Sequence, residues 1–315
     1  IPLVRDIFTM VELLKFIGLK TNILRNKNTI EIKNINKNIK TLAPYKLVKT
    51  MRAGVLVLGP LLAKYKKAKI SLPGGCAIGT RPVNLHLFAL KKLGAKIKIK
   101  NGYIIAEAKN GLKGANITFP SISVGATENA LLAAFNTNGK TTLNNCAIEP
   151  EVKDLIKFLN TLGGKIEIIG RKILIIGCKK IKKDINHEVI FDRIELGTYM
   201  IAAALVGKKI IFNKIDTKII QNEINVLKKM GVKLKAKKSI IEIFKSNNIK
   251  KISLSTKPYP GFPTDLQAQL MVLMTRAQGI SKIKESIFEN RFMHVPELKR
   301  MGANIEIKNK IAIIK

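Results

Sequence analysis

A short pattern of hydrophobic and polar positions recurs along this chain, in which a helix ending in Leu-Gly or Met-Gly precedes two short strands. In the clearest copy the helix ends at Leu93-Gly94, residues 96–100 alternate, and residues 103–105 follow the turn Asn101-Gly102. Alternation predicts strands with one buried face, and Asn-Gly predicts a two-residue hairpin turn. Glycine after the last helical turn predicts a left-handed C-cap, which other residues resist.

The pattern occurs five times at a nearly constant spacing. Its glycines, which lie 68 to 76 residues apart, are Gly18, Gly94, Gly163, Gly231 and Gly302. Isolated Leu-Gly helix ends are common in α/β proteins, but the constant spacing favours a true repeat of small α/β subdomains. Residues 213–217 separate a strand-like segment from the next helix. We therefore place a domain boundary between residues 1–213 and residues 214–315.

Length and hydrophobic content bound the class of protein. The 315 residues predict roughly two domains, and the 46% of hydrophobic residues can supply their cores. No apolar run approaches the ~18 residues of a membrane span, and Arg5 and Asp6 interrupt any signal-peptide pattern. We expect a cytoplasmic protein with no membrane partner. Because the chain opens on Ile1 rather than Met, we also expect it to be a fragment.

The formal net charge of +36 is typical of proteins that bind nucleic acid. The lysines, however, spread along the whole chain and accompany abundant Ile and Asn, whose codons are also AT-rich, so genome bias explains most of the charge. No nucleic-acid-binding signature occurs, and we expect no nucleic acid partner, although a positive field attracts small anionic substrates. The three cysteines and three histidines have neither disulfide nor metal-ligand spacing, which predicts no metal site.

The segment at residues 73–82, Pro-Gly-Gly-Cys-Ala-Ile-Gly-Thr-Arg-Pro, has the composition of a flexible surface loop. Arg81 could stabilise the thiolate of Cys76 or bind a phosphate, which favours a functional cysteine. The alternative is a small buried residue, the usual state of a free cysteine. We expect that packing role for Cys146 and Cys178, which lie at predicted strand ends.

Two further segments open helices with polar residues. Residues 121–127, Ser-Ile-Ser-Val-Gly-Ala-Thr, precede an apolar helix expected at 128–135, and exposed N–H groups at a helix start suit a diphosphate. Serine and threonine also cap many helices that bind nothing. Asp265 falls in the first turn of a helix whose buried face carries Leu266, Leu270 and Leu273. Its carboxylate could cap the helix or take a proton from a sugar hydroxyl.

Two arginines complete the candidate set. Arg52 lies at the polar start of an apolar helix, and Arg291 precedes Phe292 and Met293, which look buried. Isolated arginines are usually solvated surface residues, so neither is informative by itself.

Taken together, these segments resemble the UDP-N-acetylglucosamine 1-carboxyvinyltransferase family. The matching segments, in the order of the family, are residues 44–53, 72–86, 123–127, 192–195, 262–269 and 288–301. The cysteine loop and the Phe-Pro-Thr-Asp segment at 262–265 are highly specific, and the resemblance covers essentially the whole chain. It implies an α/β fold of two lobes, each an inside-out α/β barrel built from three similar subdomains, and the repeat fits this fold independently. In this fold residues 1–213 would be the first lobe and residues 214–315 an incomplete second lobe.

The resemblance implies transfer of the enolpyruvyl group of phosphoenolpyruvate to the 3-hydroxyl of UDP-N-acetylglucosamine, without a cofactor and with release of phosphate. This reaction is the first committed step of peptidoglycan synthesis. Cys76 would be the general acid and could bond covalently to phosphoenolpyruvate or fosfomycin, and Asp265 would be the base. Arg52 and Arg81 would hold the phosphate and carboxylate of phosphoenolpyruvate. The other implied substrate-binding residues are Pro82, Val83, Asn84, Leu85, Ser121, Ile122, Ser123, Val124, Gly125, Ile287 and Arg291.

The chain departs from the family pattern in several places. The family's substrate-binding Ser-Gly-Ala-Lys-Asn segment would precede Ile1, and its Asp-Leu-Arg-Ala segment would follow Lys315. Asn84 stands where aspartate is usual, and Ser121 and Ile148 stand where basic residues are common. We therefore expect this chain to be weakly active or inactive as it stands.

Three other functions compete with this interpretation. The enolpyruvyl transferase that acts on shikimate 3-phosphate shares the implied fold but not a Gly-Gly-Cys loop of this kind. A remnant that only binds nucleotide sugar and a basic nucleic-acid binder are the others. Neither needs to keep Cys76, Arg81 and Asp265 together, which favours the enzyme.

Overall fold

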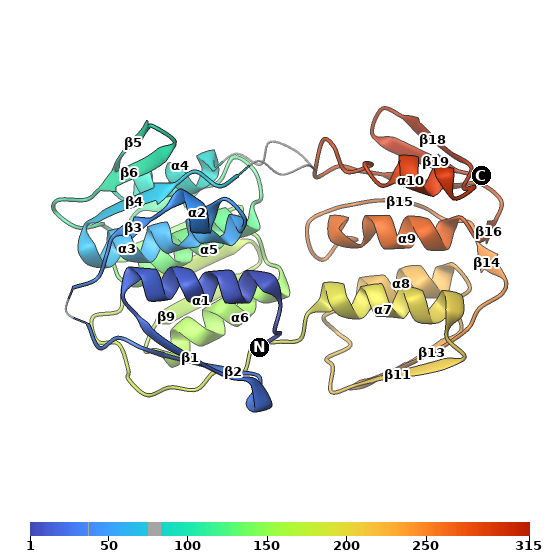
Figure 1. Ribbon diagram of the computed structural model, residues 1–315, viewed down its shortest axis with the longest axis horizontal. Helices are drawn as coiled ribbons and strands as arrows, with labels where there is room; N and C mark the ends of the chain where they lie inside the picture. The colour runs from blue at the N-terminus through green and yellow to red at the C-terminus, as the bar shows by residue number, and fades with distance from the viewer. Residues whose placement is uncertain (37, 75–82) are drawn as a thin grey trace. The chain divides into compact units, whose positions relative to one another are not determined.

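The structure is a computed structural model that describes residues 1–36, 38–74 and 83–315 (Figure 1). These residues fold into two compact units. Unit 1 contains residues 1–74 and 83–189, and unit 2 contains residues 190–315. Each unit has its own hydrophobic core, and none of the described buried residues belongs to both cores.

Unit 1 contains short helices and ten strands of two to five residues among its described residues. Its helices are α1 (Arg5–Ile17), α2 (Tyr45–Val48), α3 (Leu58–Tyr65), α4 (Asn84–Lys92), α5 (Val124–Phe135) and α6 (Pro150–Thr161), with 3₁₀ turns η1 (Arg25–Lys27) and η2 (Arg52–Val57). Its strands are β1 (Lys20–Leu24), β2 (Thr29–Lys33), β3 (Leu42–Ala43), β4 (Lys67–Ser71), β5 (Lys96–Lys100), β6 (Tyr103–Glu107), β7 (Asn116–Thr118), β8 (Lys140–Asn144), β9 (Lys165–Ile169) and β10 (Lys172–Ile176).

Unit 2 is built from the same kinds of element. Its helices are α7 (Arg193–Val206), α8 (Gln221–Lys229), α9 (Gln267–Met274) and α10 (Val295–Arg300), with the 3₁₀ turn η3 (Thr264–Leu266). Its strands are β11 (Lys209–Asn213), β12 (Leu234–Lys237), β13 (Ile240–Phe244), β14 (Ile249–Lys250), β15 (Ser253–Ser255), β16 (Ala277–Gln278), β17 (Ser281–Lys284), β18 (Ile305–Lys308) and β19 (Ile311–Ile314).

One sheet topology occurs three times. The four-stranded sheets have the orders β3-β4-β6-β5, β7-β8-β10-β9 and β15-β17-β19-β18. In each, the first two strands are parallel and are joined through a helix, and the last two form an antiparallel hairpin. The described strands form open sheets, none of which closes into a barrel by itself.

The predicted helix–glycine–hairpin repeat is confirmed in all five copies. Helices α1, α4, α6, α8 and α10 are each followed by a glycine whose φ lies between 80° and 117°. An antiparallel hairpin follows each glycine. In the clearest copy the turn residues Asn101 and Gly102 have φ values of 51° and 73°, as a tight hairpin turn requires.

The most buried helices, such as α5 in unit 1 and α9 in unit 2, lie in the interior of their units, whereas α10 is mostly exposed beside β18 and β19 (Figure 1). In unit 1, α5 contacts η2, α3, α4 and α6. It can be buried on nearly every side because it is rich in alanine and leucine, including Ala126, Ala130, Leu131 and Ala134. In unit 2, Leu266, Leu270 and Leu273 form the buried face that the sequence predicted.

The division between the units differs from the expected lobe boundary at residues 213 and 214. Helix α7 and strand β11, which we expected in the first lobe, belong to unit 2. Met200 and Ala204 of α7 lie in the same hydrophobic core as Ile241 and Leu270, and α7 contacts both α9 and β13. The chain passes from one core to the other in the coil before Arg193. This coil has no strong glycine or proline signal that would predict a boundary.

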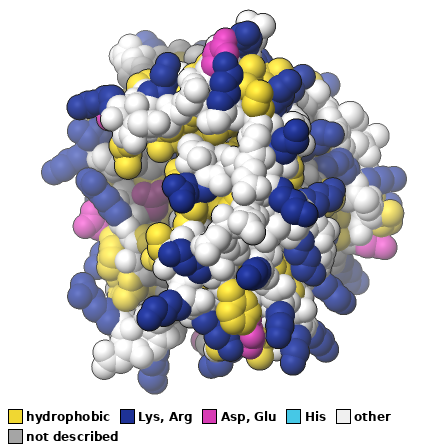
Figure 2. Space-filling view, turned by 90° about the vertical axis from the view of Figure 1, so that its right-hand side faces the viewer, with side chains coloured by type: hydrophobic (Ala, Val, Ile, Leu, Met, Phe, Trp, Pro, Cys, Tyr) yellow, Lys and Arg dark blue, Asp and Glu magenta, His cyan; other side chains and the backbone are white. Residues whose placement is uncertain are grey.

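The charged side chains are distributed widely. On the face that Figure 2 shows, lysine and arginine side chains are spread over the whole surface and do not gather in one stripe. Within the ranges described, no helix is long and apolar enough to cross a membrane.

Candidate functional site

The predicted site residues occupy equivalent places in the three repeated sheets. Each lies in the connection that follows one of the two parallel strands, and Arg52 begins η2, which comes after the short helix α2. The residues are Arg52 after β3; Val83, Asn84 and Leu85 after β4; Ser121, Ile122, Ser123, Val124 and Gly125 after β7; Asp265 after β15; and Ile287 and Arg291 after β17. Open α/β sheets bind ligands outside the carboxyl ends of their parallel strands. Alignment of the repeats could have revealed from the sequence that these residues share a place in the repeated sheets. Cys76, Arg81 and Pro82 lie outside the described residues.

The start of α5 lies earlier than the sequence predicted. The helix begins at Val124 rather than at residue 128, because the Ser123 side chain caps it by accepting a hydrogen bond from Ala126 N at 3.3 Å. Thr127 Oγ1 donates to the Ser123 carbonyl at 2.8 Å and accepts from Ala147 N at 3.1 Å. Val124 and Gly125 therefore belong to the first turn, whose N–H groups lie outside the intrahelical ladder.

A buried asparagine connects the segments of unit 1 that carry predicted site residues. Asn129 of α5 is fully buried, and its Oδ1 accepts from Gly59 N at 2.8 Å. Its Nδ2 donates to the Val55 carbonyl at 3.2 Å and lies 3.1 Å from Nδ1 of His86 on α4. This amide ties together η2, which Arg52 begins, with α4 and α5. A polar residue inside an apolar helix was the sequence signal for it.

His86 is held in its neutral form. Burial, and then the charge of Arg52, lower the pKa of His86 from 6.5 to about 4. Because the Asn129 amide donates to Nδ1, the ring carries its proton on Nε2. A Cβ on Gly125 would lie 3.1 Å from Cε1 of this ring, so glycine lets the first turn of α5 approach His86 closely.

The buried face of α5 also carries an acidic group. Burial, followed by repulsion from Glu151 and Glu149, raises the pKa of Glu128 from 4.5 to about 7. Cys146 is fully buried, and burial raises the pKa of its thiol to about 12. A thiol of this kind is inert packing, as we expected for Cys146.

In unit 2, Asp265 and Arg291 form an ion pair. Arg291 Nη2 lies 2.5 Å from Asp265 Oδ1, and the guanidinium also lies over the ring of Phe288, 5.5 Å from its centroid. The Asp265 side chain is 53% exposed, whereas that of Arg291 is 16% exposed. Asp265 therefore does not act as the N-cap of η3, where Pro263 stands. The half-exposed carboxylate can accept a hydrogen bond from a ligand hydroxyl.

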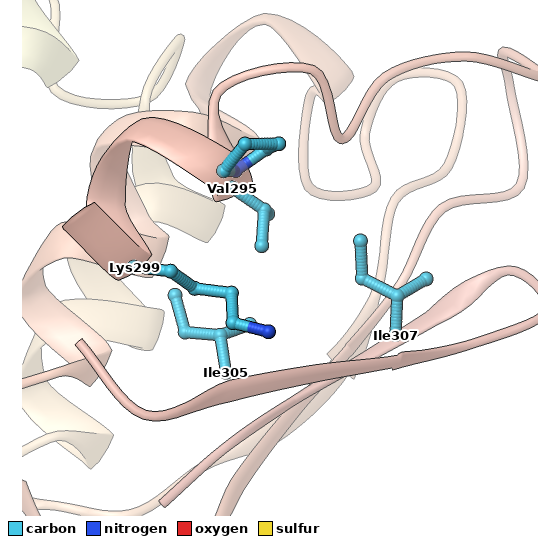
Figure 3. Close-up of a pocket in the computed structure, with 5 residues that line it drawn as sticks. Val295, Lys299, Ile305 and Ile307 are labelled. Carbon is cyan, nitrogen blue, oxygen red and sulfur yellow. The ribbon is translucent and has the colours of Figure 1, made fainter.

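An open pocket elsewhere in unit 2 contains none of the predicted site residues. It has a volume of about 410 Å³ and lies between α10 and β18. Figure 3 shows Val295 and Ile307 on opposite sides of it, with Lys299 extending over Ile305.

Comparison with known families supports the resemblance seen in the sequence. The family model of EPSP synthase (3-phosphoshikimate 1-carboxyvinyltransferase) matches residues 1–315. The chain is 57% identical over 314 residues to the UDP-N-acetylglucosamine 1-carboxyvinyltransferase of Pelagibacter ubique, covering 100% of this chain and 75% of the relative. Proteins with the same name from Endomicrobium trichonymphae and Rickettsia bellii are 48% and 47% identical, with the same coverage.

Solved structures show the fold. The enolpyruvyl transferase NikO from Streptomyces tendae matches with a TM-score of 0.87 at 21% identity, over 100% of this chain and 74% of NikO. EPSP synthase from Acinetobacter baumannii matches with a TM-score of 0.69 at 19% identity, over 98% of this chain and 73% of that enzyme. The predicted enolpyruvyl transferase fold is thereby confirmed. The chain belongs to the EPSP synthase (3-phosphoshikimate 1-carboxyvinyltransferase) family, and within it to the relatives named UDP-N-acetylglucosamine 1-carboxyvinyltransferase.

Proposed function

We propose that this protein is the enzyme that transfers the enolpyruvyl group of phosphoenolpyruvate to the 3-hydroxyl of UDP-N-acetylglucosamine, releasing phosphate. The observation that carries the proposal is the 45–57% identity, over the whole chain, to relatives named for this transfer. Through it the protein serves peptidoglycan synthesis in the cytoplasm.

Asp265 is the proposed base. Its exposed carboxylate takes the proton of the sugar 3-hydroxyl as that oxygen bonds to C2 of phosphoenolpyruvate, and Cys76 gives a proton to C3. Elimination of phosphate and a C3 proton from the tetrahedral intermediate then restores the double bond. The ion pair with Arg291, at 2.5 Å, supports this role because it fixes the direction of the carboxylate without burying it.

The segments of unit 1 are proposed to bind the anionic parts of the substrates. Arg52, together with Arg81, takes the phosphate and carboxylate of phosphoenolpyruvate through its forked donors. The first turn of α5 and Ser121 take the diphosphate, since a helix N-terminus favours phosphate. Burial keeps the His86 imidazole unprotonated at neutral pH. In this proposal the positive charge offered to phosphoenolpyruvate therefore comes from Arg52 and not from His86.

The transfer to shikimate 3-phosphate is the second candidate, because the matching family model carries that name. The relatives at 45–57% identity carry the other name, and the Gly-Gly-Cys sequence at 74–76 agrees with them. The two activities differ only in the acceptor, so one assay separates them.

Phosphate release from phosphoenolpyruvate by the purified chain tests the proposal. We expect weak release that requires UDP-N-acetylglucosamine, does not occur with shikimate 3-phosphate, and is lost in Cys76→Ala but kept in the control Cys178→Ala. Asp265→Asn should lower the rate by about 10² to 10⁴, as loss of a general base does, whereas Glu306→Gln should not.

The other outcomes are equally informative. Calorimetric binding of UDP-N-acetylglucosamine without phosphate release would leave a chain that only binds the nucleotide sugar. Release with shikimate 3-phosphate instead would overturn the proposed acceptor.

A further inference from the structure

The carboxylate of Glu285 lies inside unit 2, directly after strand β17. The residue is 1% exposed, and its backbone N donates to the Lys310 carbonyl at 2.8 Å, which continues the sheet. A buried carboxylate is costly unless hydrogen bonds replace the water it has lost. The donors around Glu285 therefore identify the segments that its carboxylate joins.

Four donors converge on this carboxylate. Oε1 accepts from Thr256 Oγ1 at 3.0 Å, from Ile287 N at 2.8 Å and from Phe288 N at 3.1 Å. Oε2 accepts from Thr264 Oγ1 at 2.9 Å. Hydrogen bonds to an ionised acceptor are about twice as strong as neutral ones. One side chain thus joins the end of β15, the turn η3 and the segment after β17.

The first of these donors is itself held from two sides. Thr256 Oγ1, which donates to Glu285, accepts from Ser286 N at 2.9 Å, and Ser286 Oγ donates to the Thr256 carbonyl. The end of β15 and the segment after β17 are therefore fastened to each other around the carboxylate. Of the four donors, Thr264 is the one that belongs to η3, so its hydrogen bond ties η3 to Glu285.

The residues joined in this way adjoin the proposed reaction site. Thr264 directly precedes Asp265, and Ile287 is a proposed substrate contact four residues before the ion-pair partner Arg291. From inside the unit, Glu285 thus holds the residue before Asp265 and the backbone of Phe288, over whose ring the Arg291 guanidinium lies.

We propose that Glu285 is a positioning residue that sets Asp265 and Arg291 in register for the reaction, acting through Thr264 and the 286–288 backbone. The inference rests on the proposed function, since it concerns the direction of the proposed base. Displacement of a reacting group by about 1 Å can cost a hundredfold in rate. Substrate binding, which depends on more contacts, should change much less.

Thr264→Val and Glu285→Gln test the inference. Thr264→Val keeps the shape of the side chain and removes its donor, and Glu285→Gln removes the charge. The matched control is Thr198→Val, which removes another threonine oxygen of unit 2, one that accepts from Gln269 Nε2 at 3.0 Å. We expect each test variant to lower kcat at least tenfold with the KM for phosphoenolpyruvate within twofold of wild type. The double variant should be no slower than the worse single variant.

A general loss of folding would give a different result. Equal kcat values in Thr264→Val and in the control, or losses that multiply in the double variant, would overturn the positioning role. The exchange of the Arg291 guanidinium protons with water, followed by NMR, provides a readout that needs no turnover. It should be faster in both test variants than in Thr198→Val. If the wild type releases no phosphate, the proposed function fails, and unchanged exchange would then separately refute the positioning role.

Discussion

Two side chains packed inside unit 1 change their ionisation on folding in opposite directions. Burial lowers the pKa of His86 to about 4, and burial with the nearby Glu151 and Glu149 raises the pKa of Glu128 to about 7. Removal from water favours the neutral form of both side chains. The free energy of unfolding of unit 1 must therefore depend on pH through both groups.

The sign of each effect follows from where the protons are bound. Between about pH 4 and 6.5 unfolded His86 binds a proton that folded His86 does not, so its contribution to stability is lost as the pH falls through this window. At about 1.4 kcal/mol per pH unit this amounts to about 3 kcal/mol. Between 4.5 and about 7 the folded state holds the extra proton on Glu128, so that contribution is lost as the pH rises.

The two slopes oppose each other in the wild type, and single substitutions should expose them. We expect the stability of unit 1 in His86→Gln to fall as the pH rises from 4.5 to 7. In Glu128→Gln it should instead rise between pH 4 and 6.5. Urea unfolding at half-unit pH intervals, followed by a probe in unit 1, measures both slopes. The same pH profile in both variants and the wild type would contradict the assignment of these protons.

At the residue scale, the sequence selected candidate residues but could not relate them to their partners. Asp265 and Arg291 were both selected, but their ion pair joins positions 26 residues apart that no local pattern relates. Glu285 carried no signal, because a glutamate after a strand is usually solvated and only the fold brings its four donors together. The functional roles of all the selected site residues remain predictions, and Cys76, Arg81 and Pro82 lie outside the described residues as well.

At the scale of elements, the helix–hairpin repeat could be predicted because each of its determinants is local. Alternation, an Asn-Gly turn and a glycine after the helix act within about a dozen residues. The starts of α5 and α9 were less predictable. Ser123 caps α5 earlier than expected, and Thr264–Leu266 forms a 3₁₀ turn before α9. Both starts depend on side-chain contacts that the apolar pattern does not specify.

The glycine that ends α10 gives a test of the repeat. Gly302 has a φ of 93°, and a Cβ added to it would meet no described atom within 4 Å. Any cost of Gly302→Ala is therefore backbone strain alone, about 1–2 kcal/mol. Gly302→Asn should cost less, because asparagine already adopts positive φ in this chain at Asn101 and Asn309.

Denaturant unfolding followed by a probe in unit 2 measures both costs. The exposed residue Lys299 of the same helix provides the control, since Lys299→Ala should change stability by less than about 0.5 kcal/mol. Equal stabilities of Gly302→Ala and wild type would show that the left-handed cap is not required.

At the scale of the whole molecule, the chain holds two separate cores. Leu131 lies fully buried in the core of unit 1, and Leu270 lies fully buried in the core of unit 2. Shortening either side chain to alanine should destabilise its own unit by about 2–5 kcal/mol. We expect calorimetry to show two transitions, with Leu131→Ala lowering one and Leu270→Ala lowering the other. A single transition that moves equally in both variants would mean that the units unfold as one.

The division between these cores was the least predictable feature of the fold. The sequence of α7 is rich in apolar residues, but its hydrophobic pattern does not indicate which of the two cores contains them. Met200 and Ile201 are compatible with either core by size and polarity, and only their packing partners assign them to unit 2. Hydrophobic periodicity predicts which face of a helix is buried, but it does not predict which distant residues pack against that face.

The threefold occurrence of one sheet topology has a consequence for how such a protein can diversify. Duplication of a single ancestral unit would supply the same strand-to-helix junction several times over. In the first parallel strand's junction, one copy now carries the cation Arg52, another the capped turn at Ser123, and a third the carboxylate Asp265. The junctions can therefore acquire different chemistry copy by copy, while a side chain such as Asn129 holds neighbouring copies together.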